Sequence, residues 1–140
     1  MRCCASTACP GADQAGGPGL LYHRSVKFDQ FTVVLLMLRP DAPELDEAAA
    51  TALQDAHLAF LAELHEAGHL LAAGPLSDDG FRGLSILNAG PDAARRLTEQ
   101  DPAVRAGRFA LKVMPWMVPA GAVSFSPTRF PHTIAEARGA

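Results

Sequence analysis

The sequence predicts an α+β domain in which two helices cover one face of an antiparallel sheet. Three observations support this fold class. Apolar, β-branched runs and helical patterns follow one another in the order β-α-β-β-α-β. The runs at 69–74 and 81–88 are joined by a turn-forming cluster, which is typical of a hairpin. A length of 140 residues with 49% hydrophobic residues is enough for a single core.

The first strand and the long helix have clear sequence signals. Residues 31–38 are an apolar and β-branched run that Arg39-Pro40 ends, which predicts a mostly buried strand. A long helical pattern then runs from 44 or 45 to 67. Pro43 and the acidic residues that follow suit the start of this helix, and Gly68 suits its end.

The second half of the chain adds a shorter helix and a last strand. Pro91-Asp92 opens the helix, and Pro102 must end it. Residues 108–116 alternate well enough for a strand. The whole order is that of the ferredoxin-like fold, in which both helices lie on one face of the sheet.

The first strand is apolar on both faces. Helices can cover only one of these faces, so the other needs a partner. A second copy of the same sheet is the simplest cover, which predicts a C2 homodimer. The alternating positions on the two faces are Val33, Leu35 and Met37, and Val34, Leu36 and Leu38.

Composition divides the chain into three parts. We expect residues 1–27 to form a disordered tail, 28–118 the α+β domain and 119–140 a C-terminal extension. The tail lacks the apolar segment of a secretory signal, and Val26 is a second candidate for the natural start. The apolar extension should pack along the body or the partner and should be loose only after about Pro131.

Charge and cysteine content restrict location and partners. All three cysteines lie in the tail, at Cys3, Cys4 and Cys9, so no disulfide is expected in the folded part and a cytoplasmic location is the default. No apolar run approaches the roughly 18 residues of a membrane span. Residues 31–118 hold twelve acidic and seven basic side chains, which argues against nucleic acid as a partner. We expect a small-molecule ligand and no cofactor.

His57 is the main candidate for chemistry. It falls on the apolar stripe of the long helix, and Asp101 follows the second helix, where its carboxylate can approach that stripe. A histidine oriented by an aspartate beside a pocket is suited to act as a general base. The alternatives are a satisfied core histidine at His57 and a turn-forming aspartate at Asp101.

Three further side chains are candidates for substrate binding. Arg39, at the end of the first strand, and Arg105, close to Asp101, are candidates to hold a carboxylate. Trp116 is a candidate to stack on a ring. The alternative is that both arginines are solvated surface charges and that Trp116 belongs to the core.

Three motifs carry a resemblance to a known family. They are Ala56-His57-Leu58-Ala59-Phe60-Leu61, Gly68-His69-Leu70-Leu71-Ala72-Ala73-Gly74-Pro75 and Asp101-Pro102-Ala103-Val104-Arg105-Ala106-Gly107. In this order and spacing they resemble the YciI-like (YCII-related) family over about 31–116. The resemblance implies a dimeric α+β barrel with a His/Asp site at His57 and Asp101, and we add Gly74 and Pro75 to the substrate-binding set.

One motif points elsewhere. His65-Glu66-Ala67-Gly68-His69 matches the zinc protease pattern H-E-x-x-H, which works only when one helix carries both histidines. Gly68 stands where the long helix should end, so the ligand geometry should be lost. We therefore expect no metal site.

Two classes of function follow. The first is a small lyase or isomerase that uses His57 and Asp101 for proton transfer. Characterised relatives of similar fold act on ring-derived acids or chlorinated hydroxyquinones, and the resemblance implies such substrates here. The second is a non-catalytic dimer that binds a small acidic or aromatic metabolite or serves as an accessory module, because a preorganised His and Asp pair also suits binding.

Overall fold

The computed structural model describes residues 25–139. The three cysteines and nearly all of the predicted tail lie outside the described residues. Among the residues described, no helix has the length and apolar character needed to cross a membrane. The elements in chain order are β2 (Phe28–Leu38), α2 (Glu47–Glu66), β3 (Leu70–Pro75), β4 (Phe81–Leu87), α3 (Pro91–Thr98), α4 (Pro102–Arg105), β5 (Phe109–Pro119) and α5 (Ile134–Ala137).

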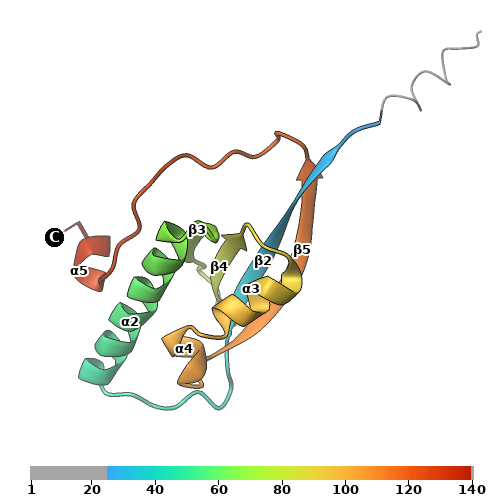
Figure 1. The fold of residues 1–140 in the computed structure, drawn as a ribbon. Coiled ribbons are helices and arrows are strands. Elements are labelled where there is room, and N and C mark those ends of the chain that lie inside the picture. The colour runs from blue at the N-terminus through green and yellow to red at the C-terminus, as the bar shows by residue number, and fades with distance from the viewer. Residues whose placement is uncertain (1–24, 140) are drawn as a thin grey trace, which may run out of the picture.

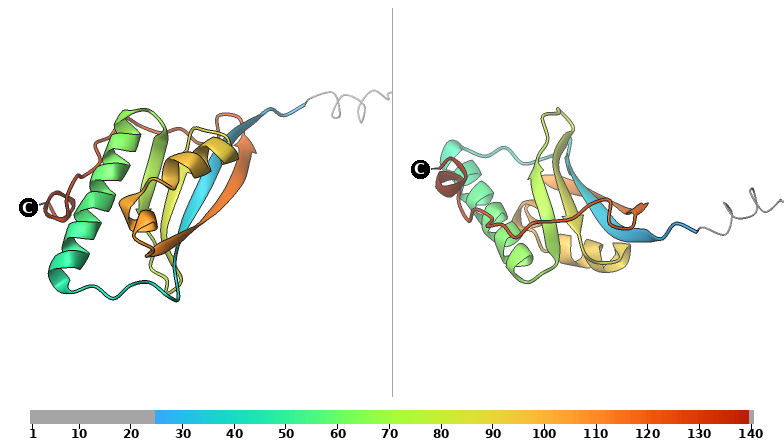
Figure 2. Two further views of the ribbon diagram at one scale, coloured as in Figure 1. Left: turned by 60° about the horizontal axis from the view of Figure 1, so that its bottom comes forward. Right: turned by 90° about the horizontal axis from the view of Figure 1, so that it is seen from above.

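The four strands form one antiparallel sheet in the order β3-β4-β2-β5. β2 occupies the centre of the sheet with β4 and β5 on its two sides, so the two halves of the chain interleave. Helices α2, α3 and α4 lie on the same side of the sheet (Figures 1 and 2). This arrangement confirms the predicted α+β class and ferredoxin-like topology. The dimer stays a prediction.

The ends of α2 follow from local chemistry. The Asp46 carboxylate accepts the Ala49 N–H at 2.8 Å, so Asp46 is the N-cap and the helix begins at Glu47. Gly68 takes a φ of +87°, the left-handed conformation that commonly terminates a helix. His69 therefore lies beyond the helix and does not share a helical face with His65, as predicted. Among residues 25–139, no group of three or more metal-ligating side chains is placed to hold an ion.

The second predicted helix is divided into two. α3 ends at Thr98, whose hydroxyl donates to the Ala94 carbonyl at 2.8 Å, and the chain turns before α4. Pro102 then begins α4, in the position where a missing N–H breaks no helical hydrogen bond. The prediction that Pro102 ends the helix is therefore wrong, because this proline begins a new one. Asp101 becomes the N-cap of α4.

The core lies between the helices and the inner face of the sheet. Full burial of a Val, Leu or Phe side chain contributes about 1.5–3 kcal/mol to folding. One buried cluster joins α2, α3 and three strands, and consists of Val34, Leu64, Leu70, Leu87 and Ala94. A second cluster joins β2, α4 and β5, and consists of Leu36, Ala103 and Phe109. Leu36 and Phe109 of the second cluster line the cavity described below, and the Phe109 ring lies beside His57.

No helix among residues 25–139 covers the outer face of the sheet (Figure 2). Phe31 on this face contacts its cross-strand partner Trp116, with ring centroids 6.0 Å apart. Phe125 from the C-terminal extension packs edge-on against Phe31 at 5.4 Å. The extension therefore shields one end of the face, while Val33 and Leu35 further along β2 remain half-buried.

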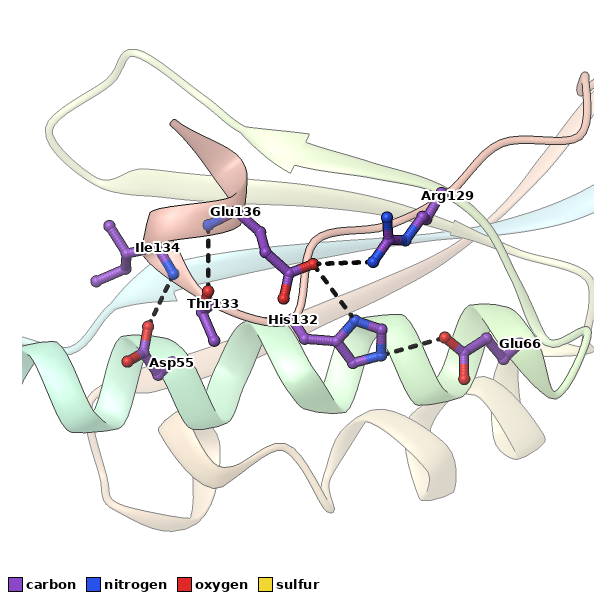
Figure 3. Close-up of polar contacts among 7 residues, drawn as sticks. All are labelled: Asp55, Glu66, Arg129, His132, Thr133, Ile134 and Glu136. Carbon is purple, nitrogen blue, oxygen red and sulfur yellow. Dashed lines mark hydrogen bonds and ion pairs between the residues drawn. The ribbon is translucent and has the colours of Figure 1, made fainter. Parts of the chain in front are cut away.

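The C-terminal extension packs along the body of the protein. It crosses from β5 to α2, and α5 lies beside α2 on the side away from α3 and α4 (Figure 1). The expectation that the chain is loose after Pro131 is wrong for the residues described. Thr133 caps α5 by accepting the Glu136 N–H at 3.1 Å, and Asp55 accepts the Ile134 N–H at 2.8 Å (Figure 3). The first bond begins α5, and the second fixes α5 against α2.

Candidate functional site

His57 and Asp101 form a direct hydrogen bond in the interior. Nδ1 of His57 lies 2.7 Å from Oδ2 of Asp101, and the two residues are only 7% and 2% exposed. α2 places His57 on its buried face, and the turn between α3 and α4 places Asp101 beside it. This contact confirms the expectation that the Asp101 carboxylate approaches the face of the long helix that carries His57.

The surroundings of Asp101 fix its orientation. Its second carboxylate oxygen, Oδ1, accepts the Ala103 N–H at 2.9 Å as the N-cap of α4. Its own N–H donates to the Thr98 carbonyl at 3.1 Å. With both oxygens engaged and the backbone held, the carboxylate has little freedom to rotate away from His57.

The carboxylate also selects the tautomer of the imidazole. An ionised carboxylate only accepts hydrogen bonds, so Nδ1 of His57 carries the proton in this pair. In neutral His57 the lone pair then resides on Nε2. Nε2 has no hydrogen-bond partner within residues 25–139, which leaves it available to a ligand.

His57 lines a cavity of about 570 Å³ between α2 and the β3 and β4 edge of the sheet. This volume suits a small-molecule ligand. Asp101 is not part of the lining, so it supports His57 from behind. The other lining residues are Leu36, Gln54, Leu58, Leu61, Ala73, Gly74, Pro75, Leu76, Arg82, Gly83, Leu84, Ser85, Arg108, Phe109, Phe130, Pro131, Ile134, Ala137 and Arg138.

The structure brings two of the five predicted substrate-binding residues into this cavity. Gly74 and Pro75, at the end of β3, are part of its wall. Their position follows from the sheet, because β3 is the edge strand next to α2. Their contact with a substrate stays a prediction.

Arg39, Arg105 and Trp116 do not line the cavity, which corrects three predictions. Arg39 bonds Asp41 through both Nε and Nη2 at 2.9 Å. That hydrogen bonding raises the pKa of Arg39 and lowers the pKa of Asp41. Arg105 is exposed in the last turn of α4, and Trp116 lies on the outer face of the sheet. For Arg105, closeness in sequence to Asp101 did not bring the side chain into the cavity.

Sequence reasoning missed three arginines in the cavity wall, at Arg82, Arg108 and Arg138. The first two carried a signal. β4 and β5 both run antiparallel to β2, so they begin at the same end of the sheet. Phe81-Arg82 and Arg108-Phe109 stand at the starts of these two strands, and the topology therefore brings both arginines to that end. Arg138 had no comparable signal, because its place depends on how the extension folds back.

Comparison with known proteins confirms the resemblance to the YciI-like (YCII-related) family. A family model described as the YCII-related domain matches residues 32–117. The chain belongs to the YCII-related domain family. A search of the curated proteins found no match.

One similar solved structure is the 5-chloro-2-hydroxyhydroquinone dehydrochlorinase from Burkholderia phenoliruptrix AC1100, in complex with 2,5-dihydroxybenzoquinone. It is 25% identical to the protein described here, with a TM-score of 0.47. The match covers 61% of our chain and 92% of the dehydrochlorinase chain. The C-terminal extension of this chain lies outside the family match at 32–117.

Proposed function

We propose that this YCII-related protein is a lyase or isomerase in which His57 transfers a proton on a small ring-derived or acidic metabolite. The observation that carries the proposal is the buried bond from Nδ1 to Asp101 at 2.7 Å in a histidine, His57, that lines the cavity and whose Nε2 has no hydrogen-bond partner among residues 25–139. A base that is oriented by a carboxylate and faces a small cavity is suited to proton abstraction.

The proposed reaction begins with Nε2 of His57. It takes a proton from a carbon next to a carbonyl, or from an activated phenol, and the released electron pair forms an enolate or phenolate. Asp101 stabilises the imidazolium that results, as in other His/Asp pairs. Isomerisation follows if His57 returns the proton to another carbon, and elimination follows if the electron pair expels a leaving group.

Binding without catalysis is the second candidate function. A cavity with a fixed imidazole and several cationic side chains also suits storage or sensing of a small acidic metabolite. We also retain the expected cytoplasmic location as part of the proposal, since residues 28–140 contain no cysteine.

A deuterium-exchange and turnover assay tests the proposal. The full chain is incubated in D₂O with muconolactone and with chlorinated hydroxyquinones, and exchange is followed by NMR and chloride release by ion chromatography. We expect turnover of at least one compound, and His57→Gln should reduce kcat/KM by about 10²- to 10⁴-fold. Ligand binding by wild type with neither exchange nor turnover would support the binding function instead.

A further inference from the structure

The cavity beside His57 has a strongly positive lining. Three arginines and no carboxylate line it, although the chain as a whole has a formal charge of −3. Arg82, Arg108 and Arg138 have no carboxylate oxygen within 4.0 Å among residues 25–139. By contrast, Arg39, Arg95 and Arg129 each have an acidic partner. Arg82 donates through Nε to the Asp79 carbonyl at 3.0 Å, so Arg108 and Arg138 are the two cations left for a ligand.

Two polar side chains of the cavity wall, Arg108 and Ser85, are restricted in position. The Arg108 guanidinium lies over the Phe109 ring, 5.3 Å from its centroid, and this contact restricts the long side chain. Ser85 lines the cavity with only 5% of its surface exposed, and its hydroxyl has no hydrogen-bond partner within the described residues. A buried hydroxyl without a partner is unfavourable unless a ligand or water satisfies it.

The C-terminal extension supplies another wall of the cavity, through Phe130, Pro131, Ile134, Ala137 and Arg138. It is held against α2 by specific contacts. The ring of Phe130 stacks on His65 with centroids 4.1 Å apart, and Nε2 of His65 contacts the Thr128 carbonyl at 3.2 Å.

Further along the C-terminal extension, polar contacts also hold it against α2 (Figure 3). Nε2 of His132 lies 3.2 Å from the Glu66 carboxylate, and the Ile134 N–H donates to Asp55. These contacts hold α5, and with it Arg138, at the rim of the cavity. Arg138 thus depends on residues outside the family match for its place in the site.

We propose that the cavity binds a small ring carrying two anionic groups, and that the C-terminal extension is the element that determines this specificity. Arg108 binds one anionic group, Arg138 binds the other, and the Ser85 hydroxyl donates a further hydrogen bond to the ligand. The inference rests on the proposed function in placing the ring beside His57. Arginine is suited to this role because its guanidinium binds carboxylates through paired hydrogen bonds.

The test is calorimetric binding of three rigid probes of similar size to the full chain. Terephthalate carries two anionic groups, benzoate one and benzamide none. We expect affinity to fall in that order. Arg108→Gln and Arg138→Gln should each weaken terephthalate binding about tenfold, the loss expected for one charge-assisted hydrogen bond, with little effect on benzamide. Arg105→Gln is the matched control, because this arginine is exposed and outside the cavity, and it should leave all three affinities unchanged.

A second variant tests the extension without altering the cavity lining. Asp55→Ala removes the acceptor of the Ile134 N–H, so α5 and Arg138 should be displaced and terephthalate binding should weaken. Loss of an acidic charge alone would favour anion binding, so the two explanations predict opposite changes.

Equal affinity for the three probes, or no binding of terephthalate at millimolar concentration, would overturn the inference. Unchanged or tighter terephthalate binding by Asp55→Ala would overturn the role of the extension. Calorimetry requires no turnover. An anion preference in a protein without catalytic activity would therefore refute only the proposed enzyme, and turnover without anion preference would refute only this inference.

Discussion

Asp101 holds His57 through one carboxylate oxygen and the start of α4 through the other. Oδ2 lies 2.7 Å from His57 Nδ1, and Oδ1 accepts the Ala103 N–H at 2.9 Å. The same residue therefore begins a helix and orients the candidate base. A change at Asp101 should affect both roles, and different substitutions should separate them.

Asp101→Asn should keep the fold but reverse the tautomer of His57. The Asn oxygen is required by the Ala103 N–H, so its amide group faces His57 Nδ1 and makes this nitrogen an acceptor. The ring proton then moves to Nε2, and the lone pair no longer faces the cavity. Long-range ¹H–¹⁵N NMR of the imidazole at high pH measures this directly. Retention of the wild-type tautomer would contradict the proposed orienting role.

Asp101→Ala should be clearly less stable than Asp101→Asn. It removes the N-cap of α4 and leaves a buried imidazole nitrogen without its partner, for a combined loss of about 2–4 kcal/mol in the free energy of unfolding. Urea denaturation of the two variants provides the comparison. Equal stability of the two would show that the carboxylate contacts contribute little to folding.

His65→Ala should loosen the C-terminal extension, whereas His69→Ala should not. Nδ1 of His65 contacts the Leu70 carbonyl at 2.6 Å and its ring stacks on Phe130, while His69 is exposed beyond the end of α2. Hydrogen exchange of residues 128–138 should therefore rise only in the first variant. The same pair tests the zinc motif, and one equivalent of zinc that is lost from the His69→Ala protein would revive that interpretation.

The turn before β4 should lose its order in acid. The Phe81 and Gly80 N–H groups donate to the Asp78 carboxylate and lower its pKa. A carboxyl group whose pKa is lower in the folded state stabilises the fold above its unfolded pKa of about 3.9 and loses this effect as the pH falls through the lower value. NMR chemical shifts of the two amides should therefore change only below about pH 4. In Asp78→Asn this acid transition should be absent.

The protein should sediment as a dimer at micromolar concentration, with the outer sheet faces packed together. Leu35 lies half-buried on this face, so Leu35→Arg should shift the protein to a monomer. Met117→Arg is a suitable control, because Met117 belongs to the same sheet but its cross-strand partner Gln30 places it on the opposite face. A folded wild-type monomer would contradict the prediction.

The local sequence determined the four strands, the long helix and their order. Apolar periodicity located all four strands and the long helix, and Gly68 marked the end of α2, because these signals depend on neighbouring residues alone. The prediction of the His57–Asp101 bond also succeeded. It combined a buried helical position with a motif resemblance, and both are properties of the sequence.

Only the tertiary structure decided which other side chains reach the cavity. Arg105 is four residues from Asp101 yet lies outside the cavity, while Arg138 is more than eighty residues from His57 and lines the same cavity. The docking of α5 on Asp55 likewise depends on a contact between distant segments. Sequence spacing determines the face of a helix or strand on which a residue lies, but the composition of a cavity depends on how those faces pack together. That packing is fixed by long-range burial and hydrogen bonding, which no local pattern records.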